Sequence, residues 1–153
     1  MKITKRFSWC MAHRLCFHKG KCFNLHGHNY EVKISVEGTL DKDGLILDFS
    51  DLKNIFNTYI HNEIDHSLMY WDKDPLAPSY KDMSRIMFLE VGKELKLVNV
   101  PFETTAENIA KWIHDIMNRE VQLLTKGRCI VNRVKVYETP TSEAVSYESY
   151  NGE

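Results

Sequence analysis

The clearest pattern in the sequence is an alternation of apolar and polar residues over residues 26–37. Val32, Ile34 and Val36 alternate with charged or polar residues, as in a β-strand that buries one face. A strand of this kind buries its apolar face only when other strands and a second layer of structure complete the core. The chain is therefore expected to fold around a sheet.

The rest of the chain predicts helices and further strands. Asp48 or Ser50 can cap a helix with apolar residues at helical spacing, and Thr104-Thr-Ala-Glu107 fits a capping box before a second helix. We expect an α+β fold, with an antiparallel four-stranded sheet and two main helices on one face. The four predicted sheet strands are 3–13, 26–37, 128–138 and 144–150, with further short strands at 45–47 and 97–100. The two main predicted helices are 50–65 and 104–124, with a short helix at 84–95.

Length and charge limit the kinds of protein that this chain can be. Its 153 residues suit a single domain, expected to span 1–153. A net charge of −1 argues against a nucleic-acid binder, and no apolar run approaches the roughly 20 residues of a membrane span. We expect a cytoplasmic protein without nucleic-acid or membrane partners, whose four cysteines are reduced.

The sharpest local feature is a pair of histidines that begins the alternating strand. His26 and His28 project from the same face because side chains two apart in a strand share a face. Antiparallel pairing with the preceding strand would bring His13 alongside them. Three neutral imidazoles and an open fourth position are typical of a catalytic zinc site, so Zn2+ is the predicted cofactor. The alternative is a set of ordinary hydrogen-bonded histidines.

Cys22 lies four residues before His26 and has two possible roles. It could be a fourth ligand that closes a structural site, or a thiol beside the metal that accepts protons as a general base. Spacing leaves both roles open. Among the other histidines, His18 is a spare ligand at best, while His61 and His114 are expected to be solvated on helices.

A set of motifs in fixed order resembles the 6-pyruvoyltetrahydropterin synthase family, and most of all its bacterial 6-carboxy-5,6,7,8-tetrahydropterin synthase branch of the queuosine pathway. The resemblance spans nearly the whole chain except residues 72–100, and the three-residue gap between Cys22 and His26 is similar to that branch. Its motifs are Phe7-Ser-x3-Ala12-His13-Arg14-Leu15, Cys22-x3-His26-Gly-His28-Asn-Tyr30, Asp65-His66, Thr105-Ala-Glu107-Asn108 and Val134-x-Val136-x-Glu138-Thr139.

This resemblance implies a tunnelling fold, in which trimers close a β-barrel and two trimers stack into a homohexamer. It implies conversion of 7,8-dihydroneopterin triphosphate to 6-carboxytetrahydropterin, triphosphate and acetaldehyde. The site residues that it implies are zinc ligands His13, His26 and His28, general base Cys22, a proton relay of Asp65 and His66, and Glu138 as the anchor of the pterin ring.

Two other functions remain open from the sequence. One is a 6-pyruvoyltetrahydropterin synthase, which releases triphosphate without breaking a carbon–carbon bond. The other is a non-catalytic zinc or pterin-binding module. Residues 72–100 exceed the compact bacterial pattern, so this segment could alter the substrate pocket. Arg14, Lys19 and Lys21 could help to hold a triphosphate, although most such residues are surface charges.

Overall fold

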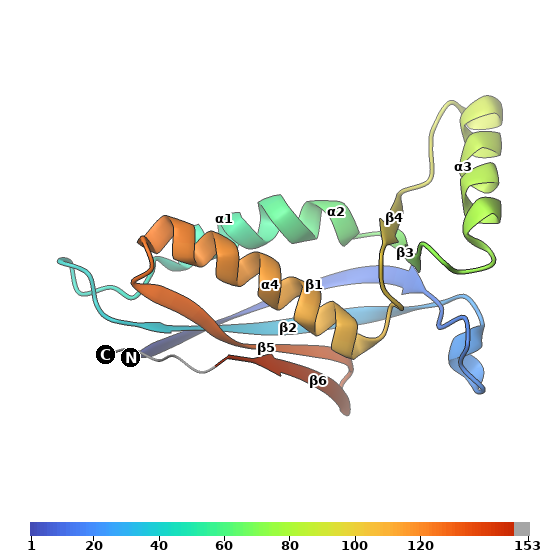
Figure 1. Ribbon diagram of the computed structural model, residues 1–153. Coiled ribbons are helices and arrows are strands. Elements are labelled where there is room, and N and C mark those ends of the chain that lie inside the picture. The colour runs from blue at the N-terminus through green and yellow to red at the C-terminus, as the bar shows by residue number, and fades with distance from the viewer. Residues whose placement is uncertain (149–153) are drawn as a thin grey trace.

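The computed structural model describes residues 1–148. Its sheet has six strands in the order β4-β3-β1-β2-β5-β6, with helices over one face (Figure 1). The strands are β1 (Lys2–His13), β2 (His26–Gly38), β3 (Ser67–Trp71), β4 (Leu97–Val100), β5 (Cys129–Thr139) and β6 (Ser142–Tyr147). The helices are α1 (Phe49–Phe56), α2 (Asn62–Ile64), α3 (Ala77–Val91) and α4 (Ala106–Thr125), with a 3-10 turn η1 (Lys21–Phe23) and a π-helical turn η2 (Asn57–His61).

The α+β class is confirmed, but the prediction of four strands is wrong. The four expected strands β1, β2, β5 and β6 lie side by side and pair antiparallel. Beside β1, two short parallel strands extend the sheet, so it is mixed. β3 was missed because its five residues carry no alternation: Ser67, Met69 and Tyr70 are all buried.

Residues 45–47 form no strand, contrary to the prediction. Ile46 and Leu47 are buried, but this segment is part of the turn that leads into α1. The guanidinium of Arg128 holds the turn, because it donates to the carbonyls of Leu45 at 3.2 Å and Ile46 at 2.9 Å. Two of the three apolar residues are therefore buried in a loop, while Leu45 is exposed.

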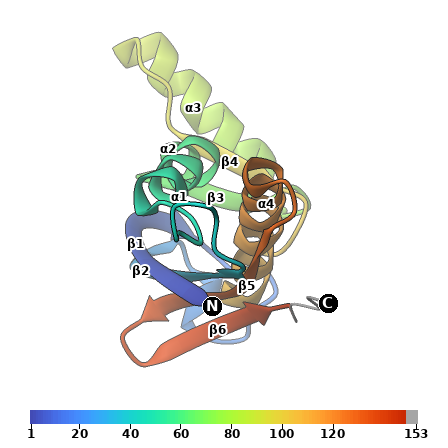
Figure 2. The ribbon, with the colours of Figure 1, turned by 90° about the vertical axis from the view of Figure 1, so that its left-hand side faces the viewer.

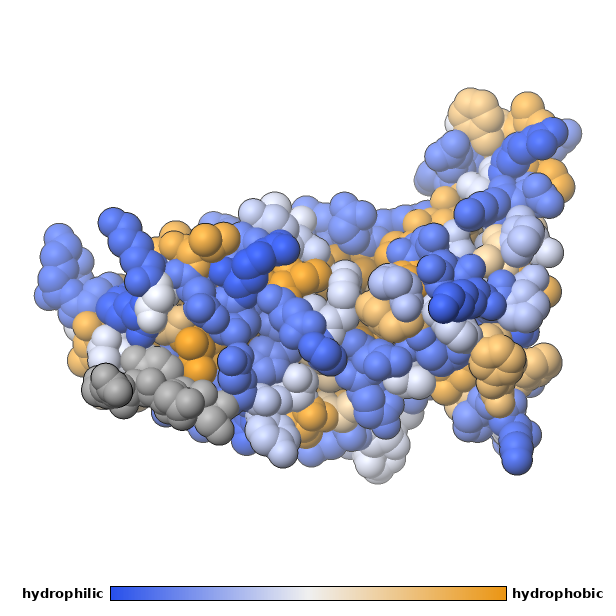
Figure 3. Space-filling model, viewed as in Figure 1, coloured by the Kyte–Doolittle hydropathy of each residue, from blue (hydrophilic) through white to orange (hydrophobic). Residues whose placement is uncertain are grey.

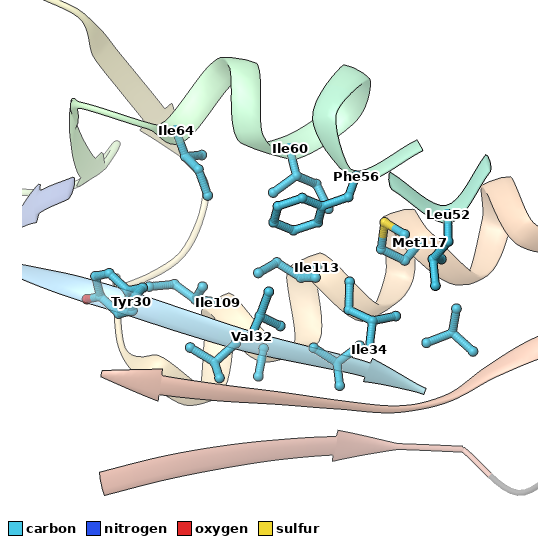
Figure 4. Close-up of a cluster of buried hydrophobic side chains, with 14 of the residues drawn as sticks. Tyr30, Val32, Ile34, Leu52, Phe56, Ile60, Ile64, Ile109, Ile113 and Met117 are labelled. Atoms are coloured by element: carbon cyan, nitrogen blue, oxygen red, sulfur yellow. The ribbon is translucent and has the colours of Figure 1, made fainter. Parts of the chain in front are cut away.

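The predicted first helix is present as the continuous run of α1, η2 and α2, which begins at Asp48 as its cap. Its buried residues are spaced by four: Leu52, Phe56, Ile60 and Ile64. In a regular α-helix three such steps drift by about 120° around the axis. The wider π turn absorbs this drift and keeps all four side chains on the sheet, as Figure 4 shows.

The second helix, α4, lies beside the first on the same face of the sheet (Figure 2). Its cap is Thr105, whose hydroxyl accepts from the Asn108 amide, so the predicted capping box is displaced by one residue. Thr104 is instead buried, and its hydroxyl donates to the Arg14 carbonyl at 3.1 Å. The core between the two helices and the sheet consists mainly of apolar side chains.

The third helix, α3, stands away from the body of the protein (Figures 1 and 3). It begins at Ala77, before the predicted residue 84, because Pro78 fits the first turn of a helix, where no amide donor is needed. Only its first turns are packed, through Ala77 and Tyr80. Its second half exposes large apolar side chains, namely Ile86, Met87, Phe88, Leu89 and Val91.

The last strand was predicted at 144–150 and is found at Ser142–Tyr147; Tyr150 lies outside the described residues. None of the helices in the described part of the chain is both long and apolar enough to span a membrane.

Candidate metal centre

Three histidines meet at one end of β1 and β2, on the face of the sheet that the helices cover. The strand register places His13 directly opposite His26, and His28 follows two residues later on the same face. That face also carries the buried Val32 and Ile34, so the apolar core runs directly into the histidines. In Figure 4 Tyr30 ends the core row, with its hydroxyl directed away from the apolar cluster.

The predicted convergence of the three imidazoles is present in the structure. One ligand atom from each of His13, His26 and His28 lies within 4.8 Å of the other two. The ring centroids are 4.7 Å apart for His13 and His26, 4.9 Å for His26 and His28, and 5.4 Å for His13 and His28. This group could hold a metal ion.

Backbone carbonyls orient two of the rings. Nδ1 of His13 donates to the Thr104 carbonyl at 2.9 Å, and Nδ1 of His26 donates to the Asn24 carbonyl at 2.7 Å. Since a carbonyl only accepts, Nδ1 carries the proton and Nε2 of each neutral ring offers its lone pair. Partners of this kind fix the tautomer and direction of metal-binding imidazoles in proteins.

Two of the three Nε2 atoms make no hydrogen bond within residues 1–148. Nε2 of His26 and Nε2 of His28 are buried and have no hydrogen-bond partner in the described structure. Burial lowers the pKa of His13 to about 4, and burial also lowers the pKa of His28. The His13 and His28 rings are therefore neutral near pH 7, which is the state that a divalent metal requires, and a metal ion fits the unpaired nitrogens of His26 and His28.

Cys22 lies near this group but is not a member of it. Its residue is half-buried in η1, and the cluster of possible ligand atoms contains the three histidines without its sulfur. The pKa of Tyr30 is raised, first by burial and then by the charges of Glu138 and Cys22. Cys22 is therefore close enough to Tyr30 to interact with it electrostatically. The Cys22 sulfur itself is not among the clustered ligand atoms of this structure.

Glu138 and Tyr30 complete the floor of the site. Glu138 follows the buried Val134 and Val136 on alternate positions of β5, so it faces inward and not toward solvent. The Tyr30 hydroxyl donates to Glu138 Oε1 at 3.2 Å and lies 3.2 Å from Nε2 of His13. Tyr30 was not among the predicted site residues, although its position two residues after His28 could have indicated it.

Asp65 and His66 form an ion pair, but the pair lies away from Cys22 and the three imidazole rings. Nδ1 of His66 lies 2.9 Å from Asp65 Oδ2, while Asp65 Oδ1 accepts from the Cys10 amide at 3.0 Å. His66, with a φ of +59°, is exposed beside a hollow of about 470 Å³ over Gly27. Among residues 1–148 no hydrogen bond or ion pair joins Asp65 or His66 to Cys22 or the three histidines.

The hollow lies on the uncovered face of the sheet. Its lining includes Cys10, Ala12 and Gly27, which alternate along β1 and β2 with the inward-facing residues. A Cβ at Gly27 would lie 3.1 Å from the Met11 carbonyl oxygen, a tight contact that glycine avoids. His66 therefore lies on the side of the sheet opposite the imidazoles of the three histidines, although His28 also borders the hollow.

Two predictions about nearby polar residues are wrong. Arg14 is not a surface cation but a buried one, paired with Asp74 at 2.9 Å. His114 is not solvated: its ring is buried between the Ser146 hydroxyl at 2.7 Å and the Val131 carbonyl at 2.6 Å. The sequence pattern predicted that both polar side chains would be exposed, and the structure buries both.

The remaining histidines stand outside the cluster. His18 is exposed, and its Nδ1 accepts from the Gly20 amide at 2.9 Å. His61 is half-buried, and its Nε2 lies 4.0 Å from Asp65 Oδ2. The metal-ligand candidates in residues 1–148 are therefore His13, His26 and His28.

The fold and this centre define an α+β protein with a three-histidine site at the end of a curled mixed sheet. Its family follows from comparison with known proteins. The family model of 6-pyruvoyl tetrahydropterin synthase matches residues 2–149, and the chain belongs to that family.

Relatives and solved structures agree with this assignment. The chain is 38% identical to the 6-carboxy-5,6,7,8-tetrahydropterin synthase of Haemophilus influenzae over 145 residues, covering 92% of this chain and 94% of the relative. It is 36% identical to the Aquifex aeolicus protein of the same name, covering 81% and 74%. An uncharacterized protein from Wolinella succinogenes has a similar fold, with a TM-score of 0.80 at 25% identity over 97% and 98%. A 6-pyruvoyltetrahydropterin synthase from Plasmodium vivax, a catalytic-residue mutant, shares the fold with a TM-score of 0.71 at 22% identity over 98% of each chain.

Proposed function

We propose that this protein is a zinc-dependent 6-carboxy-5,6,7,8-tetrahydropterin synthase, which converts 7,8-dihydroneopterin triphosphate to 6-carboxytetrahydropterin, triphosphate and acetaldehyde in queuosine biosynthesis. The observation that carries the proposal is the convergence of three imidazoles, one buried and two half-buried with unpaired Nε2 atoms, beside a thiol outside the ligand group. The names of the bacterial relatives support the same substrate class.

His13, His26 and His28 would hold the zinc ion through Nε2. When bound, zinc supplies Lewis-acid chemistry: it holds the side-chain oxygens of the substrate and stabilises negative charge as a carbonyl enolises. With three histidine ligands from the protein, the ion would be able to bind a substrate oxygen as well.

Cys22 would act as the general base that removes a proton from the substrate side chain. A positive metal centre nearby favours the thiolate, which is the form that accepts the proton. Glu138 would bind the amino-pyrimidine edge of the pterin ring, since a carboxylate accepts two parallel hydrogen bonds from such an edge. Tyr30 supports this role because its hydroxyl already holds Glu138 Oε1.

Asp65 and His66 would provide the relay that returns a proton. The Asp65 carboxylate beside Nδ1 orients the imidazole and stabilises its cationic form. Because His66 serves the face opposite the three histidines, a working site needs a second chain to bring it to Cys22. This supports assembly into the proposed homohexamer, and the apolar residues that α3 exposes also favour an assembled state.

The test is to incubate the zinc-loaded protein with 7,8-dihydroneopterin triphosphate and to identify the products by mass. We expect 6-carboxytetrahydropterin and trapped acetaldehyde in equal amounts, and no product from His28→Ala. A 6-pyruvoyl product without acetaldehyde would support a 6-pyruvoyltetrahydropterin synthase instead. Zinc binding without any conversion would support a non-catalytic module.

A further inference from the structure

The short segment that carries Cys22 has little packing of its own. η1 contains no buried residue, and Gly20 at its N-terminus offers no side-chain cap. The Leu15 amide donates to the Cys22 carbonyl at 2.8 Å. The other tie to the end of β1 comes from Arg14, so the position of the thiol depends on how that side chain is held.

Arg14 contacts the residue next to Cys22 in two ways. Its Nη1 donates to the Phe23 carbonyl at 3.4 Å, and its Cζ lies 4.7 Å from the centre of the Phe23 ring, which is a cation–π contact. Arg14 also directly follows the metal-ligand candidate His13. One guanidinium therefore links the end of β1 to the segment that carries the thiol.

The other side of this guanidinium is fixed from outside the site. Nε of Arg14 donates to Asp74 Oδ2 at 2.9 Å, and the two side chains are only 8% and 2% exposed. A buried charge pair of this kind has a strongly preferred geometry, because any displacement leaves a charge without its partner. Arg14 is thus unavailable to bind a triphosphate, but it is well suited to hold a loop.

Asp74 is in turn held by the start of α3. Its Oδ1 accepts from the Leu76 amide at 2.9 Å, and its Oδ2 accepts from the Tyr80 hydroxyl at 3.3 Å. Tyr80 is buried against Tyr70, with ring centroids 5.3 Å apart. Burial and the neighbouring Asp74 raise the pKa of Tyr80 to about 12, so the phenol keeps the proton that it donates.

We propose that the buried chain Tyr80–Asp74–Arg14 positions Cys22, so that the segment between β3 and β4 controls the rate of the reaction without touching the substrate. The inference rests on the proposed function, because Cys22 is the base in that reaction. Arg14, Asp74 and Tyr80 are positioning residues: they act through the backbone and ring of Phe23.

The test compares Asp74→Asn and Tyr80→Phe with Asp115→Asn, which makes the same chemical change in an exposed ion pair with Lys111 on α4. For each zinc-loaded protein, kcat, KM and zinc content are measured. The rate at which iodoacetamide alkylates Cys22 is measured without substrate, and peptide mass mapping separates Cys22 from the exposed Cys10.

We expect Asp74→Asn to lower kcat by roughly 10- to 100-fold, because a displacement of about 1 Å is enough for such a loss. KM and zinc content should stay within about twofold, and alkylation of Cys22 should become at least about threefold faster as its segment loosens. Tyr80→Phe, which removes one hydrogen bond, should change the same quantities in the same direction, with a smaller loss of kcat of about three- to tenfold. Asp115→Asn should match the wild type.

The proposal is overturned if folded Tyr80→Phe keeps both the wild-type kcat and the wild-type alkylation rate. It is also overturned if kcat falls while alkylation of Cys22 is unchanged, since the thiol would then not have moved. Should the wild type show no turnover, the proposed function fails, but the alkylation rates of the variants still decide whether the chain positions the thiol.

Discussion

Replacing Cys22 with alanine separates the two roles that a cysteine beside three histidines can have. The three imidazoles converge without its sulfur, so the variant should still bind one zinc ion per chain with an affinity within about threefold of the wild type. Because η1 has no buried residue, the unfolding free energy should change by less than about 0.5 kcal/mol.

The effect on the reaction should be large. A positioned general base contributes roughly 10²- to 10⁴-fold, and at about 1.4 kcal/mol per factor of ten the barrier should rise by about 3–5 kcal/mol. Because the Glu138 carboxylate and the zinc ligands are untouched, KM should change little. The loss should therefore appear almost entirely in kcat.

The assay measures zinc by competition with a chromogenic chelator and turnover by the mass of the pterin product. Cys10→Ala is the matched control for metal content, because its thiol lies on the opposite face of β1 and bonds Asn29 Oδ1 at 3.0 Å. If Cys22→Ala weakens zinc binding by about 100-fold or more while Cys10→Ala does not, the thiol is a ligand and its assignment as a base is wrong.

Three further predictions concern the residues around the site and the sheet. Burial holds the pKa of His13 near 4 against its ordinary value of 6.5, so between these values the unfolded chain binds more protons than the folded one. Metal-free protein should be most stable above about pH 6.5 and lose up to roughly 3 kcal/mol as the pH falls toward 4; urea unfolding at pH 7 and 4.5 measures this, and an unchanged midpoint would contradict it. Glu138→Gln should raise KM for the pterin by roughly 10- to 100-fold through loss of charge-assisted hydrogen bonds, as steady-state kinetics would show, whereas an unchanged KM would remove Glu138 from the pterin site. Gly38→Ala should cost about 1–3 kcal/mol in thermal unfolding, because its Cβ would overlap the carbonyl oxygen of Arg128, the residue directly before β5; a wild-type melting curve would refute that contact.

Periodicity was enough to predict the long elements. The strand that carries His26 and His28 and the helix that carries Ile109 and Ile113 each bury one face, and such faces leave a regular pattern in the sequence. The convergence of His13 on the other two histidines could also be predicted, since antiparallel pairing aligns residues 13 and 26.

What the sequence did not predict depends on contacts between distant residues. β3 is too short and too evenly buried to show alternation, and its pairing with β1 is a long-range event. The burial of Arg14 follows from Asp74, sixty positions away, and that of His114 from Val131 and Ser146. Local patterns assign such polar residues to solvent because they carry no information about a distant partner.

The most direct test of the account is X-ray absorption at the zinc edge of the zinc-loaded protein. Coordination by His13, His26 and His28 predicts three imidazole nitrogens at about 2.0–2.1 Å and one light atom from solvent, with no sulfur. A zinc–sulfur distance of about 2.3 Å would show the Cys22 thiolate on the metal, and the proposed proton transfer would then have no base.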